Sequence, residues 1–151
     1  MTILLSIVRL HKEVPLPVRA YPSSAALDLC ANLITSGGHS FTLTIQPNSV
    51  KLIGTGLAMR PAANHTILVC SRSGLATRGI FVANAPGVVD PDYTGELKVA
   101  LFNGSQEPHY VKHRDRVAQI LVVPFLSGSL LETTELPQTE RGDRGFGSTG
   151  D

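Results

Sequence analysis

Apolar and polar residues alternate in several short runs along the chain. This two-residue period is typical of strands with one buried face, because successive side chains on a strand point to opposite faces. Turn-forming residues separate the runs, and no stretch keeps the period of an amphipathic helix. The runs predict strands at Phe41, Leu43 and Ile45; at Val50 and Leu52; at Ile67 and Val69; at Leu97, Val99 and Leu101; and at Val117, Gln119, Leu121 and Val123.

The same pattern predicts an all-β fold, a compact antiparallel jelly roll or distorted β-barrel of short strands. One short helix is expected over 73–78, with Ser73 as its cap. The apolar segment 1–10 lacks a basic lead, so it indicates a first strand rather than a signal peptide. We expect a β-barrel domain over residues 1–136 and a flexible, glycine-rich C-terminal arm over 137–151.

Composition and net charge limit the kinds of binding partner that the chain can have. The chain of 151 residues fits one domain, with 42% apolar and 17% charged residues and a net charge of +1. So weak a charge provides no field for nucleic acid or an anionic membrane, so neither is an expected partner. Cys30 and Cys70 lie far apart in apolar runs, which favours buried thiols and a reducing compartment, cytoplasmic or nuclear. No zinc-ligand spacing occurs among His11, His39, His65, His109 and His113.

Polar clusters interrupt the strand pattern. In the first, Asp28 stands alone between apolar neighbours, where it either accepts backbone hydrogen bonds or serves a ligand. In the second, Arg72, Ser73 and Gly74 open the expected helix with donors suited to an anion. An ordinary capped turn is the alternative for that cluster. In the fourth, Gln119 lies among alternating apolar residues, where an amide completes a network or contacts a ligand.

The third cluster, from Asn84 to Lys98, predicts a hairpin-type excursion between two strands. Asp90 follows two valines and precedes Pro91, which restricts its backbone and holds its carboxylate where it can orient a water. Tyr93 offers a flat ring to a sugar. The alternatives are a turn-forming Asp90 and an ordinary half-buried tyrosine.

The fifth cluster is the chain end, Arg141–Asp151, which sets four glycines and two hydroxyls around one aromatic ring. Such a tail can fold over a polyanion, with Arg141 as a forked cation and Phe146 stacked on a nucleobase. A solvated terminus is the alternative. The G-x-G-x-x-G spacing within it is not a dinucleotide fingerprint, because no helix follows.

Taken together, the five clusters resemble, in order, the motifs of the homotrimeric dUTPase family over nearly the whole chain. The matching segments are Ser24–Cys30, Ser71–Ala76, Gly87–Gly95, Arg114–Gln119 and Arg141–Gly150. Three positions depart from the family pattern: Ala26 and Arg114 replace glycines, and Ser71 replaces a proline. If the backbone at Arg114 needs a positive φ, that residue is strained.

The resemblance implies hydrolysis of dUTP to dUMP and pyrophosphate, with water attacking the α-phosphorus and Mg²⁺ bridging the phosphates. It makes Asp90, Gln119 and Arg141 the catalytic residues, with Asp90 as the base, and lets Asp28 hold Mg²⁺ through water. It implies a homotrimer with shared active sites. The implied substrate contacts are Arg72, Ser73, Gly74, Asn84, Gly87, Val88, Val89, Asp90, Tyr93, Lys98, Gln119, Arg141, Phe146, Gly147, Ser148 and Thr149.

Within that implied site, uracil lies in the third-cluster hairpin, Tyr93 rejects a 2′-hydroxyl, and Phe146 caps the base. Two other functions fit related patterns. A dCTP deaminase needs polar groups aimed at C4 of the base, whereas Asn84 suits uracil. A non-catalytic nucleotide-binding module is expected to lack Asp90 or the tail, and this chain has both.

Overall fold

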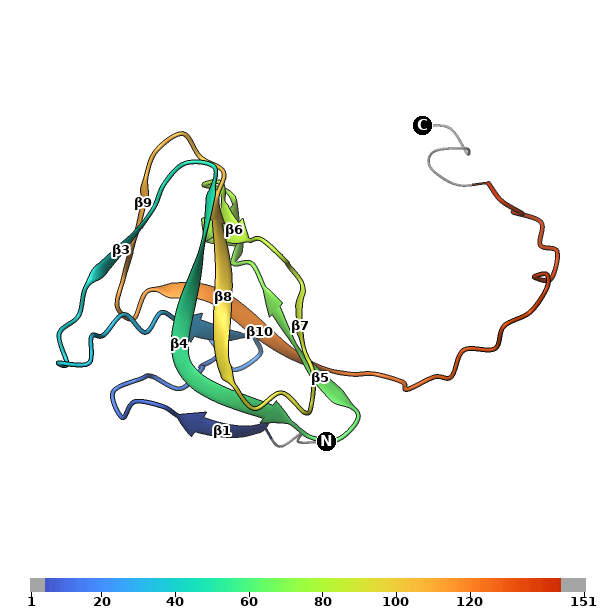
Figure 1. The fold of residues 1–151 in the computed structure, drawn as a ribbon, viewed down its shortest axis with the longest axis horizontal. Coiled ribbons are helices and arrows are strands. Elements are labelled where there is room, and N and C mark those ends of the chain that lie inside the picture. The colour runs from blue at the N-terminus through green and yellow to red at the C-terminus, as the bar shows by residue number, and fades with distance from the viewer. Residues whose placement is uncertain (1–4, 145–151) are drawn as a thin grey trace.

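Two four-stranded antiparallel sheets form the body of the protein in the computed structural model, which describes residues 5–144 (Figure 1). The first sheet has the order β1-β4-β8-β6, the second has the order β2-β10-β5-β7, and β3 and β9 form a separate pair. The strands are β1 (Leu5–Arg9), β2 (Leu27–Cys30), β3 (Thr42–Ile45), β4 (Ser49–Pro61), β5 (His65–Cys70), β6 (Ile80–Val82), β7 (Gly87–Val89), β8 (Glu96–Asn103), β9 (His109–Lys112) and β10 (Arg116–Pro124).

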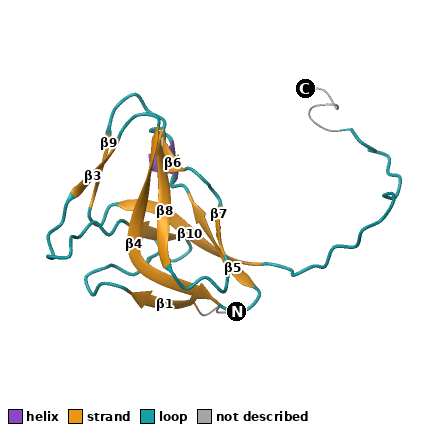
Figure 2. Cartoon of the chain, viewed as in Figure 1, coloured by secondary structure: helices purple, strands orange, loops and turns teal. Residues whose placement is uncertain are grey.

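The all-β prediction is confirmed, since strands joined by loops make up nearly all of the regular structure (Figure 2). The sheets remain separate, so the arrangement is a jelly-roll-like body and not a closed barrel. Both sheets contribute to one apolar core, whose fully buried side chains include Leu29, Ile53, Ile67, Val99 and Ile120. Burial of branched aliphatic side chains between sheets stabilises this packing.

In two predicted strands, the buried face is not the one that the alternating residues indicate. In β4, Val50 and Leu52 are 49% and 63% exposed, whereas Ile53 is fully buried. In β10, a register irregularity follows Arg116, and Ala118 rather than Gln119 faces the core. A bulge of this kind changes which residues point inward. Gln119 is thereby turned to the outer face of its sheet.

Among the described residues, the one helix is α1 (Ser73–Ala76), shorter than the predicted segment 73–78. The prediction that Ser73 caps it is wrong. Arg72 occupies the cap position with extended backbone (φ −91°, ψ 131°) and makes no side-chain capping bond. Its guanidinium is engaged elsewhere, with Asp28. No helix in the described part of the chain has the length and apolarity to cross a membrane, and the cellular compartment stays a prediction.

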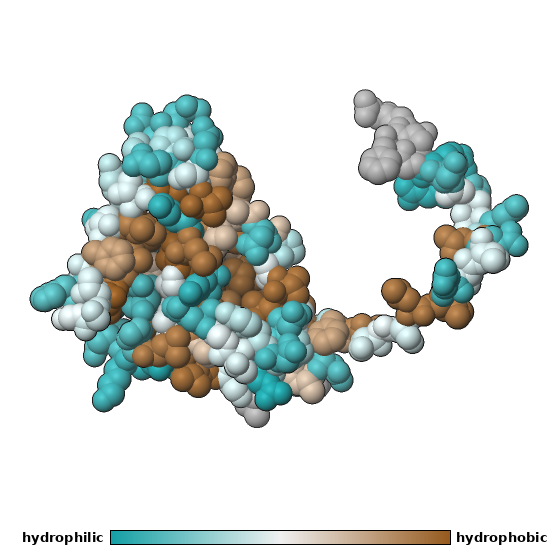
Figure 3. Space-filling view, in the orientation of Figure 1, coloured by the Kyte–Doolittle hydropathy of each residue, from teal (hydrophilic) through white to brown (hydrophobic). Residues whose placement is uncertain are grey.

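Beyond β10 the chain leaves the sheets and extends away from the body without helix or strand up to residue 144 (Figure 1). Apolar side chains are exposed along this segment (Figure 3). They are Phe125, Leu126, Leu130, Leu131 and Leu136. The predicted arm over 137–151 lies within and beyond this stretch, and its boundary at residue 137 stays a prediction.

Arg114 has a positive φ of 69°, in the left-handed region where a Cβ is disfavoured. The sequence-based concern about this position is therefore confirmed. The residue is held by an N–H bond to the Ala31 carbonyl, and its guanidinium contacts Glu13, with an N–O separation of 3.7 Å. That ion pair is exposed, so it contributes little to stability.

We expect Arg114→Gly to raise the free energy of unfolding relative to Arg114→Ala by about 1 kcal/mol, because both remove the guanidinium but only glycine removes the Cβ. The measurement is urea unfolding of all three proteins at one fixed protein concentration. Equal stability of the two variants would contradict the assignment of strain to this backbone position.

Candidate functional site

An open slot separates β7 from β8, because the chain changes sheets between β6 and β7. β6 pairs with β8 only over Leu101–Asn103, followed by a last bond from the Ala83 N–H to the Ala100 carbonyl. β7 then pairs with β5 in the other sheet. Within the described residues, β7 and β8 form no ladder, so the predicted hairpin is wrong. Their facing edges leave room for a ligand that offers its own donors and acceptors.

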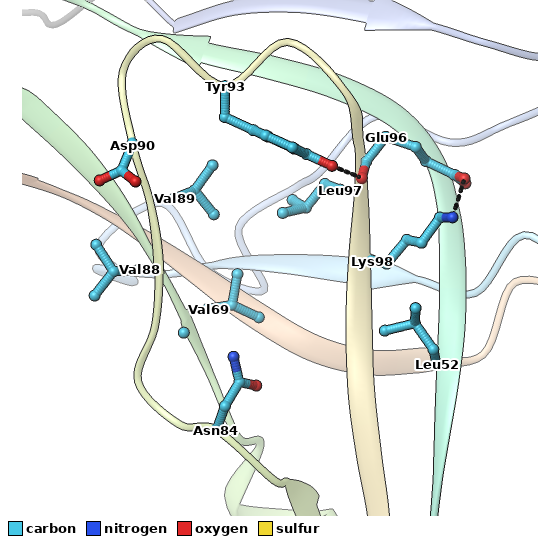
Figure 4. Close-up of a pocket in the computed structure, with 11 residues that line it drawn as sticks. Leu52, Val69, Asn84, Val88, Val89, Asp90, Tyr93, Glu96, Leu97 and Lys98 are labelled. Carbon is cyan, nitrogen blue, oxygen red and sulfur yellow. Dashed lines mark hydrogen bonds and ion pairs between the residues drawn. The ribbon is translucent and has the colours of Figure 1, made fainter.

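The slot holds a cavity of about 310 Å³, within the range of small-molecule sites. All the third-cluster residues that the sequence predicted line it (Figure 4). The rest of the wall, which the sequence did not predict, comes from β4, β5 and the start of β8. The full lining is Leu52, Val69, Asn84, Gly87, Val88, Val89, Asp90, Tyr93, Glu96, Leu97 and Lys98.

Polar side chains lie at both ends of the slot, and Glu96 and Lys98 lie along its β8 side (Figure 4). The Asn84 amide lies against Gly87, where an added Cβ would come within 3.1 Å of Asn84 Nδ2. At the other end, the Tyr93 hydroxyl donates to the Glu96 carbonyl at 2.9 Å. Asp90 directly follows β7, and its carboxylate is turned away from the Tyr93 ring (Figure 4). The arrangement gives a slot with both apolar and polar walls, with an amide at one end and a carboxylate near the other.

A second polar cluster lies on the outer face of β2 and β10. Asp28, whose side chain is 10% exposed, accepts from Arg72 Nε at 2.8 Å and from Arg116 Nη1 at 3.1 Å. Each carboxylate oxygen thus has a guanidinium partner, which offsets the cost of burying the charge. The sequence predicted Asp28 and Arg72 but missed Arg116. Its signal was the position directly after the β9–β10 turn in the fourth cluster.

Gln119 lies opposite Asp28 across the β2–β10 ladder. Its amide donates to the Ser71 carbonyl at 2.8 Å, and the Ser71 hydroxyl accepts from the Val82 N–H at 2.9 Å. Ser71 thus ties the turn before α1 to β6, an interaction that a proline side chain does not offer. The N–H groups of Ser73 and Gly74 have no hydrogen-bond partner within residues 5–144, as expected for a helix start.

Two further cavities flank this cluster, of about 350 and 340 Å³. The first cavity is lined by several cationic side chains. Burial of His109 there lowers its pKa, and the nearby positive charge of Arg78 lowers it further. Burial, with a contribution from Asp28, raises the pKa of the Cys30 thiol beside the cluster, so this thiol is not a ready nucleophile. The first cavity is lined by Arg72, Leu75, Arg78, His109, Tyr110, Val111, Asp115, Arg116 and Val117, and the second by Ala20, Ser24, Ala25, Ala26, Asp28, Gln119 and Leu121.

The slot and the arginine cluster share no lining residue among those described. Arg141 lies in the extended segment after β10, where its Nε donates to the Arg144 carbonyl at 2.9 Å. The structure therefore does not bring Arg141 to either group. Phe146, Gly147, Ser148 and Thr149 lie outside the described residues.

The side chains around Asp28 offer few free oxygen ligands for a metal ion. Both Asp28 oxygens are bound by guanidinium groups, and the described residues contain no cluster of three or more His, Cys, Asp or Glu side chains suited to an ion. Mg²⁺ prefers oxygen ligands and keeps much of its water. The described residues would fit such an ion only if a polyphosphate supplied most of its ligands.

Comparisons with known proteins show the family of the chain. The sequence model of the family described as dUTPase matches residues 12–150. The chain belongs to the dUTPase family. Among related sequences, the deoxyuridine 5′-triphosphate nucleotidohydrolase of Nautilia profundicola is 40% identical over 97% of this chain and 98% of its own. That of Desulfitobacterium hafniense is 43% identical over 95% and 92% of the two chains.

Solved dUTPase structures share the fold at lower identity. The dUTPase of Staphylococcus bacteriophage 80alpha, solved with dUPNHPP, aligns with a TM-score of 0.81 at 23% identity, covering 98% of this chain and 99% of the phage chain. A mutant dUTPase from phage phi11 of S. aureus, described with a structural Mg(II) ion, aligns with a TM-score of 0.76 at 18% identity over 89% of this chain and 99% of its own.

The arginine cluster of this dUTPase predicts unequal couplings to Asp28. In double-mutant cycles of unfolding free energy, Asp28→Asn and Arg72→Gln should couple by about 1–2 kcal/mol, and Asp28→Asn with Arg116→Gln by less. The reason is exposure, 24% for the Arg72 side chain against 54% for Arg116. A larger coupling for Arg116 would contradict this ranking.

Proposed function

We propose that the chain hydrolyses dUTP to dUMP and pyrophosphate. The observation that carries the proposal is the slot between β7 and β8, with Asn84 at one end and Asp90 beside the other, in a chain related over nearly its full length to dUTP nucleotidohydrolases. The slot supports uracil recognition because a planar base can hydrogen-bond to strand edges that lack a neighbour.

Selectivity for uracil and deoxyribose follows from the same walls. Asn84, with the backbone at Val88 and Lys98, imitates a pairing partner at the base edge. Cytosine meets a mismatched donor there, and a narrow slot excludes the thymine methyl. The Tyr93 ring lies below the sugar and leaves no room for a 2′-hydroxyl; Gly87 and Val89 complete the apolar wall.

The phosphates of dUTP bind at the arginine cluster in this proposal. Arg72 and the open N–H groups of Ser73 and Gly74 offer donors to the phosphates, and the Gln119 amide lies beside them. Asp90 accepts the proton of the water that attacks the α-phosphorus; its backbone position directly after β7, at the end of the slot, supports this role. Mg²⁺, when bound, offsets phosphate charge, and Asp28 holds its water.

Complete sites require a homotrimer in this proposal. One chain keeps its base slot and its arginine cluster apart, and its segment after β10 leaves the body. In the trimer, one copy supplies the slot, a second the arginine cluster, and a third the arm. Arg141, Phe146, Gly147, Ser148 and Thr149 then close over base and γ-phosphate and exclude other water. The free Cys30 and Cys70 thiols support a reducing compartment, cytoplasm or nucleus.

Asp90→Asn should retain dUTP binding, and its kcat should fall by about 10²–10⁴-fold, since the amide cannot accept the proton of the water. Pyrophosphate release with Mg²⁺, together with calorimetric binding of a non-hydrolysable dUTP analogue, measures both. Asp92→Asn is the matched control two residues away and should stay within a few-fold of the parent. Unchanged turnover in Asp90→Asn would remove the base role, and ammonia release from dCTP would indicate a deaminase.

Shared sites predict complementation between two inactive proteins. A chain ending at Glu140 and full-length Asp90→Asn should each hydrolyse little dUTP, because one lacks the arm and the other lacks the base. Mixed trimers, formed by refolding the two together, should regain activity where an intact slot meets an intact arm. A mixture as inactive as its components, despite mixed trimers seen by native mass spectrometry, would contradict the sharing of sites.

A further inference from the structure

We infer that Glu96 is a positioning residue that sets the discrimination between deoxyribose and ribose by fixing Tyr93 through a bulge in β4. The inference rests on the proposed function, because it assumes that Tyr93 faces the sugar. It concerns an anchor outside the residues predicted from the sequence, and it depends on contacts between β4 and β8 that lie far apart along the chain.

The bulge lies where the β4–β8 register shifts between Gly54 and Ala58. Two side-chain contacts link it to β8. The Glu96 carboxylate accepts from the Gly56 N–H at 2.8 Å, and the Thr55 hydroxyl donates to the Leu97 carbonyl at 2.6 Å. Because a bulge leaves backbone groups outside the ladder, these contacts satisfy groups that would otherwise be orphaned.

Gly54 makes room for this carboxylate, and Gly56 lets the backbone of the bulge adopt its conformation. A Cβ on Gly54 would lie 2.6 Å from Glu96 Oε1, closer than a Cβ approaches an oxygen without displacing it. Gly56 has a φ of +68°, and a Cβ there would lie 2.5 Å from Val14. The side chain of Glu96 is 26% exposed, so its bond to Gly56 is partly shielded from water. The carboxylate therefore occupies a fitted position in the bulge.

The same residue holds Tyr93 through its main chain. The Tyr93 hydroxyl donates to the Glu96 carbonyl at 2.9 Å, and the bond spans the turn at Gly95 (Figure 4). A Cβ on Gly95 would lie 2.6 Å from the Tyr93 hydroxyl oxygen, so the ring folds closely over this turn. Anchoring the carboxylate of Glu96 fixes its carbonyl, and the carbonyl fixes the ring. Lys98 Nζ, 3.9 Å from Glu96 Oε2, adds a weak and exposed ion pair.

The first test reads the ring directly and needs no substrate. With tyrosine labelled at the ring carbon that bears the hydroxyl, Glu96→Ala should shift the Tyr93 signal and leave those of Tyr21 and Tyr110 in place. Tyr93→Phe assigns the signal, and Gly95→Ala, which crowds the hydroxyl, is the positive control. Glu96→Gln keeps an oxygen acceptor for Gly56 and should retain the parent signal. An unmoved Tyr93 signal in Glu96→Ala would overturn the inference whatever the enzyme does.

The second test measures kcat/KM for dUTP and UTP. Glu96→Ala should raise the UTP-to-dUTP ratio roughly tenfold, as expected for a loosened contact at a specificity group, whereas Glu96→Gln should restore the parent ratio. Gly54→Ala displaces the same carboxylate, so its effect should not add to that of Glu96→Ala. Ile120→Val, a buried change in β10, controls for a general loss of stability and should leave the ratio unchanged.

The outcomes separate this inference from the proposed function. If Tyr93→Ala changes the ratio and Glu96→Ala does not, the anchor is wrong and the function stands. If the Tyr93 signal shifts in Glu96→Ala while no variant changes the ratio, the sugar is read elsewhere and the specificity role is overturned. A shift in both measurements, reversed in Glu96→Gln, supports the inference.

Discussion

The site depends on one constraint, the failure of β7 to pair with β8. A chain that continued from β6 along β8 would satisfy every backbone group of that edge, and no base could bind there. Instead the chain crosses to β5, and the edges of two sheets face each other across a gap. The cost of leaving polar groups without strand partners is tolerable only if water or a ligand satisfies them. This favours a ligand with a hydrogen-bonding edge and a flat, apolar face.

The arginine cluster lies apart from this slot and shares no lining residue with it among those described. Asp28 keeps Arg72 and Arg116 in place on the outer face of the second sheet, and its two oxygens offset two cations that otherwise repel each other. The pairing also orients the guanidinium groups before any anion arrives, which reduces the ordering cost of binding. The base slot and the arginine cluster are held apart in one chain. In the proposed trimer, a ligand would bridge the slot of one copy and the arginine cluster of another.

The sequence predicts best what is local. Asn84, Asp90 and Tyr93 lie within one short segment, so their grouping follows from chain order. Chain order does not tell which sheet β7 joins, and the hairpin prediction failed for that reason. The facing of β4 was missed because apolar Val50 and Leu52 point outward, and Arg116 was missed because its partner Asp28 is 88 residues away. Such features are set by packing between distant strands.

The departures from the family pattern show how much a backbone position constrains its side chain. At Ser71 the proline is replaced by a residue whose hydroxyl accepts from Val82, so a new contact substitutes for a stiff turn. At Arg114 the glycine of the family pattern is replaced, but the backbone strain is not relieved, since φ remains positive. The guanidinium gains only an exposed partner. The strain persists because the N–H of Arg114 bonds to Ala31 and that of Ala31 bonds to Asp115. These paired backbone bonds fix the turn that leads into β10, and with it the position of Gln119 opposite Asp28.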